Sequence, residues 1–254
     1  MGTAVECGEL VCNSNRYAKH VNRQWVRLLD LLEMNVPYER CSGAELYTSD
    51  GRRIVDFLSG YCVHNVGHNH PDVVEALQNE LARCGPAMIQ THVADLAGEL
   101  AERLCARAGG RLRKVFFASS GSEGVEAAIK FARAHTRRPG ILAAEHAFHG
   151  LTCGALSLMS DEFWQEGFGP LLPETTIIPF GSVEALERKL KSKRFAAFIV
   201  EPIQSEAGVR IPDPDYLRNA ETLCRRYGTL FVLDEVQTGM YPHRSFFGCS
   251  SVRS

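Results

Sequence analysis

The pattern of apolar positions is most distinctive in two stretches that run without alternation and then end in carboxylates. Phe195–Val200 is followed by Glu201, and residues 229–233 are followed by Asp234. Such runs are typical of strands buried on both faces of a parallel sheet. Ligands of open α/β sheets bind at the carboxyl ends of the strands. We therefore expect both strands to deliver acids and amides to one edge, with Gln204, Glu206, Glu235 and Gln237 as the further polar residues.

Shorter apolar runs and helical periodicities alternate in the same part of the chain. We expect strands at 115–118, 141–144 and 175–179, and helices at 123–135, 182–190 and through 217–223 to 227. The Gly-, Pro- and aromatic-rich stretch 161–173 is expected to be a long loop. Alternation of strand and helix from residue 115 to 236 predicts an α/β fold with a mainly parallel sheet covered by helices.

The N-terminal part has a different pattern, which predicts a small α+β segment. Apolar residues at helical spacing predict an amphipathic helix at 17–34, and alternation around Ser49-Asp50-Gly51 predicts a hairpin at 45–59. We expect Asn69 to cap a helix that begins near Pro71, and a second helix to span 92–108. The inward-facing residues are expected to be Val21, Trp25, Leu28, Leu29 and Leu32, then Val73, Val74, Leu77 and Leu81, then Leu96, Leu100 and Leu104.

Composition and charge exclude several classes of protein. The 254 residues are 45% hydrophobic and 23% charged with a formal net charge of −2, which allows a large core and offers no basic stripe for nucleic acid. No apolar run approaches the roughly 20 residues of a membrane span. We expect a cytoplasmic protein without membrane or nucleic-acid partners. The nine cysteines form no C-x-x-C pairs, so we expect reduced core thiols, including Cys62, Cys105, Cys153 and Cys224.

Three histidines, His64, His68 and His70, lie close together in the stretch 60–71. They allow two interpretations, a metal site or a loop that leads into a helix. Because metal sites usually include supporting Asp, Glu or Cys ligands and none cluster here, the loop is favoured.

Two other loops carry candidate binding residues. The turn Ser119-Ser120-Gly121-Ser122 lies between an expected strand and an expected helix, which would place free backbone N–H groups and a positive helix end around a phosphate. Simple helix capping is the alternative. After the strand at 141–144, Phe148 and His149 precede Gly150, and Phe148 is either a core residue or a ligand contact.

Six motifs between Gly43 and Met240 together resemble the class III aminotransferases, pyridoxal-phosphate enzymes of fold type I that include ornithine, acetylornithine and 4-aminobutyrate transaminases. The resemblance implies transamination between an amino donor and a 2-oxo acid, with pyridoxal 5'-phosphate as cofactor, in a homodimer. It also implies an N-terminal segment at 1–60, a partial cofactor-binding domain at 61–241 and an aberrant tail at 242–254. The motifs are GAELYTSDGRRIVDFLSG, GHNHPDVVEAL, SSGSEGVEAAIKFAR, AFHG, FIVEPIQSEAGV and FVLDEVQTG.

The resemblance also implies a role for each matching residue. Ser120, Gly121 and Ser122 match the phosphate-binding turn, Phe148 matches the aromatic that stacks on the pyridine ring, and His149 follows it. Asp234 matches the catalytic carboxylate that pairs with the ring nitrogen. Gln237 matches the residue near the phenolic oxygen, and Glu201 and Glu206 match acids on the substrate side.

The chain departs from the family pattern at three places. Leu151 stands where relatives with ornithine-like substrates often carry arginine, which puts a conventional α-carboxylate site in doubt. No lysine follows Lys193, so the family's Schiff-base lysine is missing and we expect negligible transamination by this chain alone. Residues 242–254 read as a frameshift product.

Two alternative functions remain open from the sequence. One is a non-catalytic binding or interaction protein that keeps the fold. The other is an ATPase or GTPase module, because an apolar strand that ends in Asp234-Glu235 also resembles a magnesium-binding strand. The G-x-x-x-x-G-K-[ST] loop of such modules does not occur.

Overall fold

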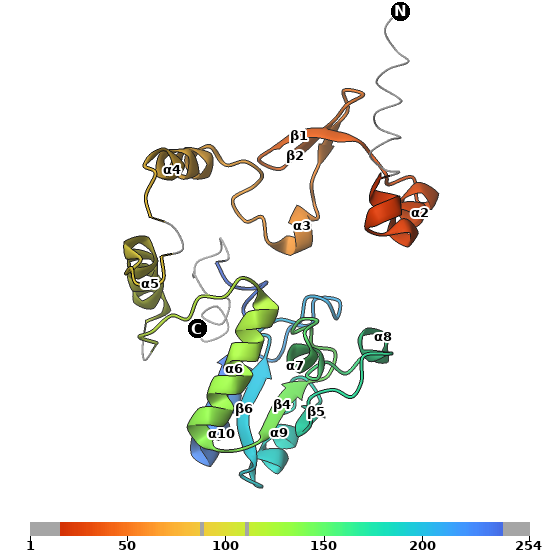
Figure 1. Ribbon diagram of the computed structural model, residues 1–254. Helices are drawn as coiled ribbons and strands as arrows, with labels where there is room; N and C mark the ends of the chain where they lie inside the picture. Colours follow the sequence, from red (N-terminus) through yellow and green to blue (C-terminus); the bar gives the residue numbers. More distant parts are fainter. Residues whose placement is uncertain (1–15, 87–88, 110–111, 241–254) are drawn as a thin grey trace, which may run out of the picture. The chain divides into compact units, whose positions relative to one another are not determined.

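The computed structural model describes residues 16–86, 89–109 and 112–240, and divides into two compact units, Met1–Ile89 and Gln90–Ser254 (Figure 1). The domain ranges implied by the family resemblance stay a prediction, and the tail at 242–254 lies outside the described residues. None of the described helices is both long and apolar enough to span a bilayer.

The first unit contains a three-stranded antiparallel sheet in the order β1-β2-β3. Leu46 in β2 pairs with Ile54 in β3, which confirms the predicted hairpin around residues 49–51. The strands are β1 (Tyr38–Ser42), β2 (Glu45–Thr48) and β3 (Arg53–Val55), and the helices are α2 (Arg23–Leu31), α3 (Ser59–Cys62) and α4 (Pro71–Ala82).

The single helix predicted at 17–34 is wrong in its extent, because Asn22 interrupts it. The Asn22 side chain accepts a hydrogen bond from the Trp25 N–H at 2.9 Å and starts α2 as its N-cap. Asparagine competes for backbone N–H groups in this way wherever a helix can begin. The apolar residues of the stretch do not face inward, since no residue of α2 is buried.

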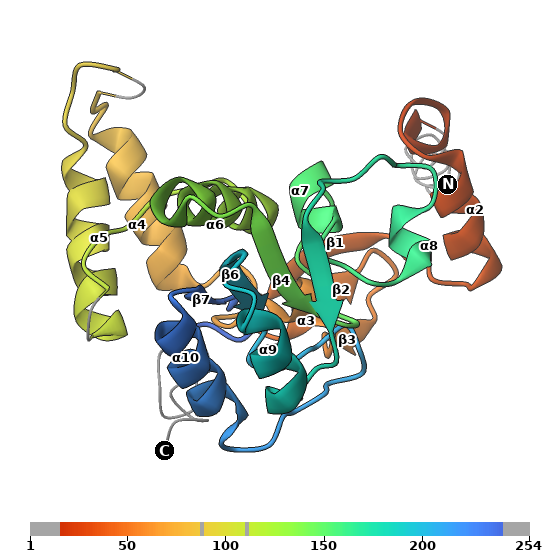
Figure 2. The ribbon, with the colours of Figure 1, turned by 90° about the horizontal axis from the view of Figure 1, so that it is seen from below.

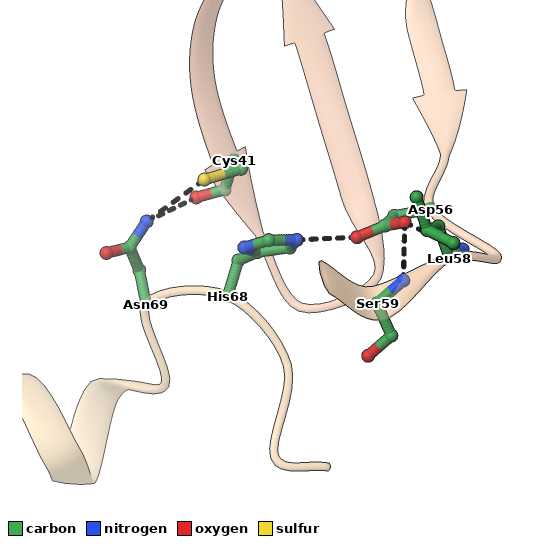
Figure 3. A network of polar contacts seen from close by, with 6 residues as sticks. All are labelled: Cys41, Asp56, Leu58, Ser59, His68 and Asn69. Carbon is green, nitrogen blue, oxygen red and sulfur yellow. Dashed lines mark hydrogen bonds and ion pairs between the residues drawn. The ribbon is translucent and has the colours of Figure 1, made fainter. Parts of the chain in front are cut away.

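The predicted cap of α4 is also wrong by one residue. His70 is the N-cap, and its Nδ1 accepts the Asp72 N–H at 3.3 Å, with Pro71 at the first helical position as expected. Asn69 has a φ of +50° and donates its amide to the Cys41 carbonyl at 2.8 Å (Figure 3). The expected inward stripe of α4 is solvent-exposed.

His68 has a carboxylate partner in the first unit. Its Nε2 lies 2.7 Å from Asp56 Oδ2, and Asp56 Oδ1 accepts the N–H groups of Leu58 and Ser59 (Figure 3). The His68 hydrogen bond lowers the pKa of Asp56. Across the described residues, no group of three metal-ligating side chains is found.

The second unit contains a four-stranded parallel sheet in the order β5-β4-β6-β7, which confirms the predicted α/β fold as a partial domain (Figure 2). Its strands are β4 (Gly140–Ala144), β5 (Thr175–Ile178), β6 (Phe195–Val200) and β7 (Leu230–Leu233). Its helices are α5 (Asp95–Ala108), α6 (Gly121–Thr136), α7 (Cys153–Leu156), α8 (Glu162–Gln165), α9 (Val183–Leu190) and α10 (Tyr216–Tyr227).

The sheet is covered on both faces by helices from this unit. On one face, Val125, Ile129 and Ala132 of α6 pack against Ile141 and Ile199. On the other face, α9 and α10 pack against alternate residues of the same strands, among them Leu142, Phe198 and Val200. Because β4 and β6 have neighbours on both sides, every one of their residues is buried.

β7 is an edge strand in the described chain, so it is less buried than its apolar sequence predicts. It pairs with β6, and none of its residues is fully buried. The strand predicted at 115–118 does not form, because no strand of the sheet pairs with it, and Phe116 and Phe117 are exposed. An apolar run without a hydrogen-bonding neighbour cannot satisfy its backbone as a strand.

Two further expectations fail at the surface of the second unit. The stretch 161–173 is not wholly a loop, since it contains α8, and α5 has no buried residue although inward-facing leucines were predicted.

The cysteines expected in the core differ in burial. Cys224 is buried as expected, and burial raises its pKa to about 12, but Cys153 is exposed at the start of α7. The side chain of Cys62 lies outside the described residues.

Candidate cofactor site

The parallel register of β6 and β7 brings their carboxylates to one edge of the sheet. Val200 is in register with Leu233, and the Asp234 N–H donates to the Val200 carbonyl at 2.9 Å. Glu201 and Asp234 are the next residues of the two strands. The two predicted strands that are followed by carboxylates, β6 and β7, therefore end side by side.

Asp234 and His149 form a buried pair at this edge. Asp234 Oδ2 lies 2.8 Å from His149 Nδ1, and the two side chains are 7% and 0% exposed. The other carboxylate oxygen accepts the Val236 N–H at 3.2 Å, which fixes the plane of the carboxyl group. His149 Nε2 is buried and has no partner among the described residues. The site thus holds a fixed carboxylate and an unsatisfied imidazole nitrogen.

The predicted turn before α6 forms a capped helix N-terminus. Ser120 is the N-cap, and its Oγ accepts the Glu123 N–H at 3.2 Å, while Glu123 Oε2 accepts the Ser119 N–H at 2.6 Å. Gly121 and Ser122 are the first two residues of the helix, whose N–H groups have no partner within a helix. They are available to an anion, and the helix dipole favours negative charge at this end.

Two close approaches show that the turn, the aromatic loop and the acid strand meet. A Cβ on Gly121 would lie 2.8 Å from Cγ2 of Val236, and a Cβ on Gly150 would lie 2.1 Å from Oγ of Ser122. The φ of Gly150 is +116°, which side chains rarely allow. Three segments far apart in the sequence are therefore in contact around the residues expected to share one site.

Phe148 lies in the loop after β4 and is bonded to the residue that follows β6. Its N–H donates to Glu201 Oε1 at 2.9 Å, and its ring meets the ring of Trp164 edge-on, with centroids 5.4 Å apart. Trp164 lies at this site and was missed in the sequence, where it reads as part of a loop. The run of aromatic residues in DEFWQEGFGP was the signal that could have indicated it.

Glu201 is a buried acid, only 5% exposed. Burial raises its pKa to about 7, although the hydrogen bond from Phe148 and the charge of His149 act in the opposite direction. The negative charges of Asp234 and Glu206 add to the rise. Near neutral pH, the Glu201 carboxyl group is therefore present in both its protonated and its ionised form.

The raised pKa of Glu201 leads to a test of pH-dependent stability. Because the folded pKa of about 7 lies above the ordinary 4.5, the protein loses stability as pH rises from about 4.5 to above 7, by about 3 kcal/mol for this group. Glu201→Gln keeps an oxygen for the Phe148 N–H and never ionises. We expect its free energy of unfolding in urea to match the parent at pH 4.5 and to exceed it by about 3 kcal/mol at pH 8.

Glu166→Gln, at an exposed acid, should change neither value. A parent whose stability relative to Glu201→Gln is the same at both pH values would contradict a buried, titrating Glu201.

Further polar groups line the same edge. Gln237 donates its amide to Glu206 at 3.3 Å, while Gln237 Oε1 and Thr238 Oγ1 are buried and unpaired within the described chain. Gln204 is fully buried, and its amide donates to the Glu145 carbonyl at 2.9 Å. This bond links the loops that follow β6 and β4, and the sequence did not indicate it.

The residues present fit a phosphorylated heteroaromatic ring. The helix N-terminus suits the phosphate, the Phe148 side chain offers an aromatic face, and Asp234 offers a fixed carboxylate. The unpaired atoms of His149, Gln237 and Thr238 provide further polar partners at the same edge.

Comparison with known proteins identifies a family for this arrangement. The profile of the family described as Aminotransferase class-III matches residues 30–252. The aminotransferase PigE of a Serratia strain is 40% identical over 236 residues, which are 92% of this chain and 28% of that protein.

Two solved transaminases are similar in structure. The ornithine aminotransferase of Toxoplasma gondii, whose active site holds pyridoxal phosphate at partial occupancy, has a TM-score of 0.80 and 29% identity over 86% of this chain and 53% of its own. An (S)-enantioselective omega-transaminase of Thermomicrobium roseum has a TM-score of 0.85 and 28% identity over 96% of this chain and 61% of its own. The chain thus spans little more than half the length of these enzymes, and less than a third of PigE.

The cofactor of the family is pyridoxal phosphate. On the extent of the profile match and the shared fold, this chain belongs to the class III aminotransferase family.

Proposed function

We propose that this chain forms the cofactor-binding part of a pyridoxal-phosphate-dependent transaminase, which transfers an amino group between an amino acid or ω-amine and a 2-oxo acid. The observation that carries the proposal is the buried Asp234–His149 pair, in a cluster of loops that also contains the N-terminus of α6. The family assignment supports the reaction, and the geometry supports the residue roles.

The phosphate would be held by the turn before α6. The N–H groups of Gly121 and Ser122 and the hydroxyl groups of Ser120 and Ser122 supply donors, and the helix dipole adds a favourable field. Gly150 is needed for this cradle, because its missing side chain allows the loop to approach Ser122.

The ring would be held by Asp234, Phe148 and Gln237. The Asp234 carboxylate would stabilise a proton on the ring nitrogen, and its bond to His149 keeps the carboxylate oxygen in place. Phe148 would cover the ring, and Gln237 would hold the side of the phenolic oxygen. A protonated pyridine ring, when bound, supplies the electron sink for the carbanion that forms when the substrate loses a proton.

The substrate side is assigned to Glu206, which is exposed and touches Gln237. Leu151 is also exposed and stands where an arginine would grip a carboxylate. We therefore propose a donor that is not held by an arginine at this position, which suits an amine better than an α-amino acid.

The proposal includes a cytoplasmic homodimer. Cys41, Cys84, Cys105, Cys153 and Cys224 are free thiols, which suits a reducing compartment. The exposed apolar residues of α2, α4 and α5 suit an interface, since monomers seldom expose large apolar surfaces.

A thermal-shift titration of the full chain tests the cofactor part of the proposal. We expect pyridoxal 5'-phosphate to raise the melting temperature in a saturable way, and pyridoxal without the phosphate to raise it much less. MgATP should have no effect. Stabilisation by MgATP together with no response to pyridoxal phosphate would contradict the proposal and favour the nucleotide-binding alternative.

A further inference from the structure

The Glu201 carboxylate reaches across to a loop of another strand. Its Oε1 accepts the N–H of Phe148 at 2.9 Å, so the exit of β6 is tied to the exit of β4. A backbone N–H that is removed from water needs such a partner. In the described chain this bond therefore fixes the peptide at Phe148.

The peptide that Glu201 holds carries two residues of the cofactor site. Phe148 presents the ring that packs edge-on against Trp164, and the next residue, His149, pairs with Asp234. A shift of the Phe148 N–H would therefore move the aromatic face and strain the His149 contact. Sub-ångström positioning of such groups is what binding sites require.

From this geometry we infer that Glu201 is a positioning residue for pyridoxal phosphate that acts through the Phe148 backbone, in place of the substrate contact expected from the family resemblance. The inference rests on the proposed function. It concerns an oxygen acceptor at a fixed distance, so it depends on the reach of the side chain and not on its charge.

The surroundings of Glu201 favour this role over an ion pair with a substrate. The residue is 5% exposed, and the titratable groups around it are His149, Asp234 and Glu206. Because burial and the two acids raise its pKa to about 7, the group is partly neutral near neutral pH. A neutral amide of the same length should therefore replace it.

The test compares two conservative variants that separate reach from charge. Glu201→Gln keeps the reach and removes the charge, whereas Glu201→Asp keeps the charge and is shorter by one methylene. The parent carries Trp25→Phe, which leaves Trp164, beside Phe148, as the one tryptophan. Quenching of Trp164 emission by added pyridoxal phosphate gives the dissociation constant.

We expect Glu201→Gln to bind within about threefold of the parent and Glu201→Asp to bind about tenfold more weakly, the effect of about one lost hydrogen bond. In the Phe148→Leu background, Glu201→Asp should have a smaller effect than in the parent, because only the contact between His149 and Asp234 remains to be displaced. The inference is overturned if Glu201→Asp binds like the parent, if Glu201→Gln is weakened as much, or if the effects of Glu201→Asp and Phe148→Leu multiply.

Hydrogen exchange at the Phe148 amide gives a second readout that does not need the cofactor. Exchange should be slow in the parent and in Glu201→Gln, and faster in Glu201→Asp. Fast exchange in the folded parent overturns the inference even if Glu201→Asp does not fold. A parent that does not bind pyridoxal phosphate contradicts the proposed function, whereas binding without the expected difference between variants contradicts this inference alone.

Discussion

Replacing Asp234 with asparagine is expected to weaken the binding of pyridoxal phosphate about 100-fold, or about 2.7 kcal/mol, while the fold persists. The single asparagine oxygen can still accept the bond from His149 Nδ1, which lies 2.8 Å from the carboxylate, and only the 3.2 Å bond from the Val236 N–H is lost. The loops should therefore stay in place. The negative charge that stabilises a proton on the ring nitrogen is lost. The measurement is the dissociation constant from Trp164 quenching, with the melting temperature of the free protein as a check on the fold.

Asp215→Asn is the matched control for this variant. Asp215 forms an exposed ion pair with Arg218 at the start of α10. Exposed pairs of this kind contribute little, so the control should bind the cofactor like the parent. Equal binding by Asp234→Asn and the parent would show that Asp234 does not pair with the ring.

The second large effect is expected for Gly150→Ala, which should lower the free energy of unfolding by about 4 kcal/mol. A Cβ here would lie 2.1 Å from Oγ and 3.0 Å from Cα of Ser122, and the φ of +116° strains any side chain. Relief requires movement of the phosphate-binding turn, so cofactor binding should weaken as well. Urea denaturation, followed by cofactor titration of the folded fraction, measures both effects.

Gly181→Ala separates backbone strain from close approach. Gly181 also has a positive φ, +82°, but a Cβ there would meet no atom within 4 Å. Its cost should therefore be about 1 kcal/mol, from strain alone. Equal destabilisation of Gly150→Ala and Gly181→Ala would contradict the close approach of Gly150 to Ser122.

The central strands and the helices between them could be predicted because their signals are local and dense. The uninterrupted apolar run of β6 requires burial on both faces, and neighbours on both sides of the strand provide it. Ser120 accepts a capping bond, which was the alternative given for the turn at 119–122, and Ser182 accepts one at the start of the helix expected at 182–190. The meeting of Glu201 and Asp234 followed from parallel strand direction alone.

The failures occur where structure depends on a partner that the local sequence does not specify. Residues 115–118 have the composition of a strand, but a strand forms only beside another strand. β7 was expected to be buried because it is apolar, yet its place at the edge decided its exposure. The exposed stripes of α4 and α5 show that helical periodicity identifies an apolar face without identifying what covers it.

Within the site, the sequence indicated residue types and missed the contacts between them. Neither the bond from the Phe148 N–H to Glu201 nor the tie from Gln204 to Glu145 follows from spacing along the chain. Trp164 was hidden in a stretch that resembled a loop, although α8 places it against Phe148. Such contacts depend on tertiary distances, which hydrophobic patterns do not encode.

A crystal structure of the chain with bound pyridoxal phosphate tests the central claim most directly. We expect the phosphate to accept hydrogen bonds from the N–H groups of Gly121 and Ser122, and the ring nitrogen to face the Asp234 carboxylate beside His149. A cofactor bound at another place, or bound here with its ring nitrogen turned away from Asp234, would contradict the account.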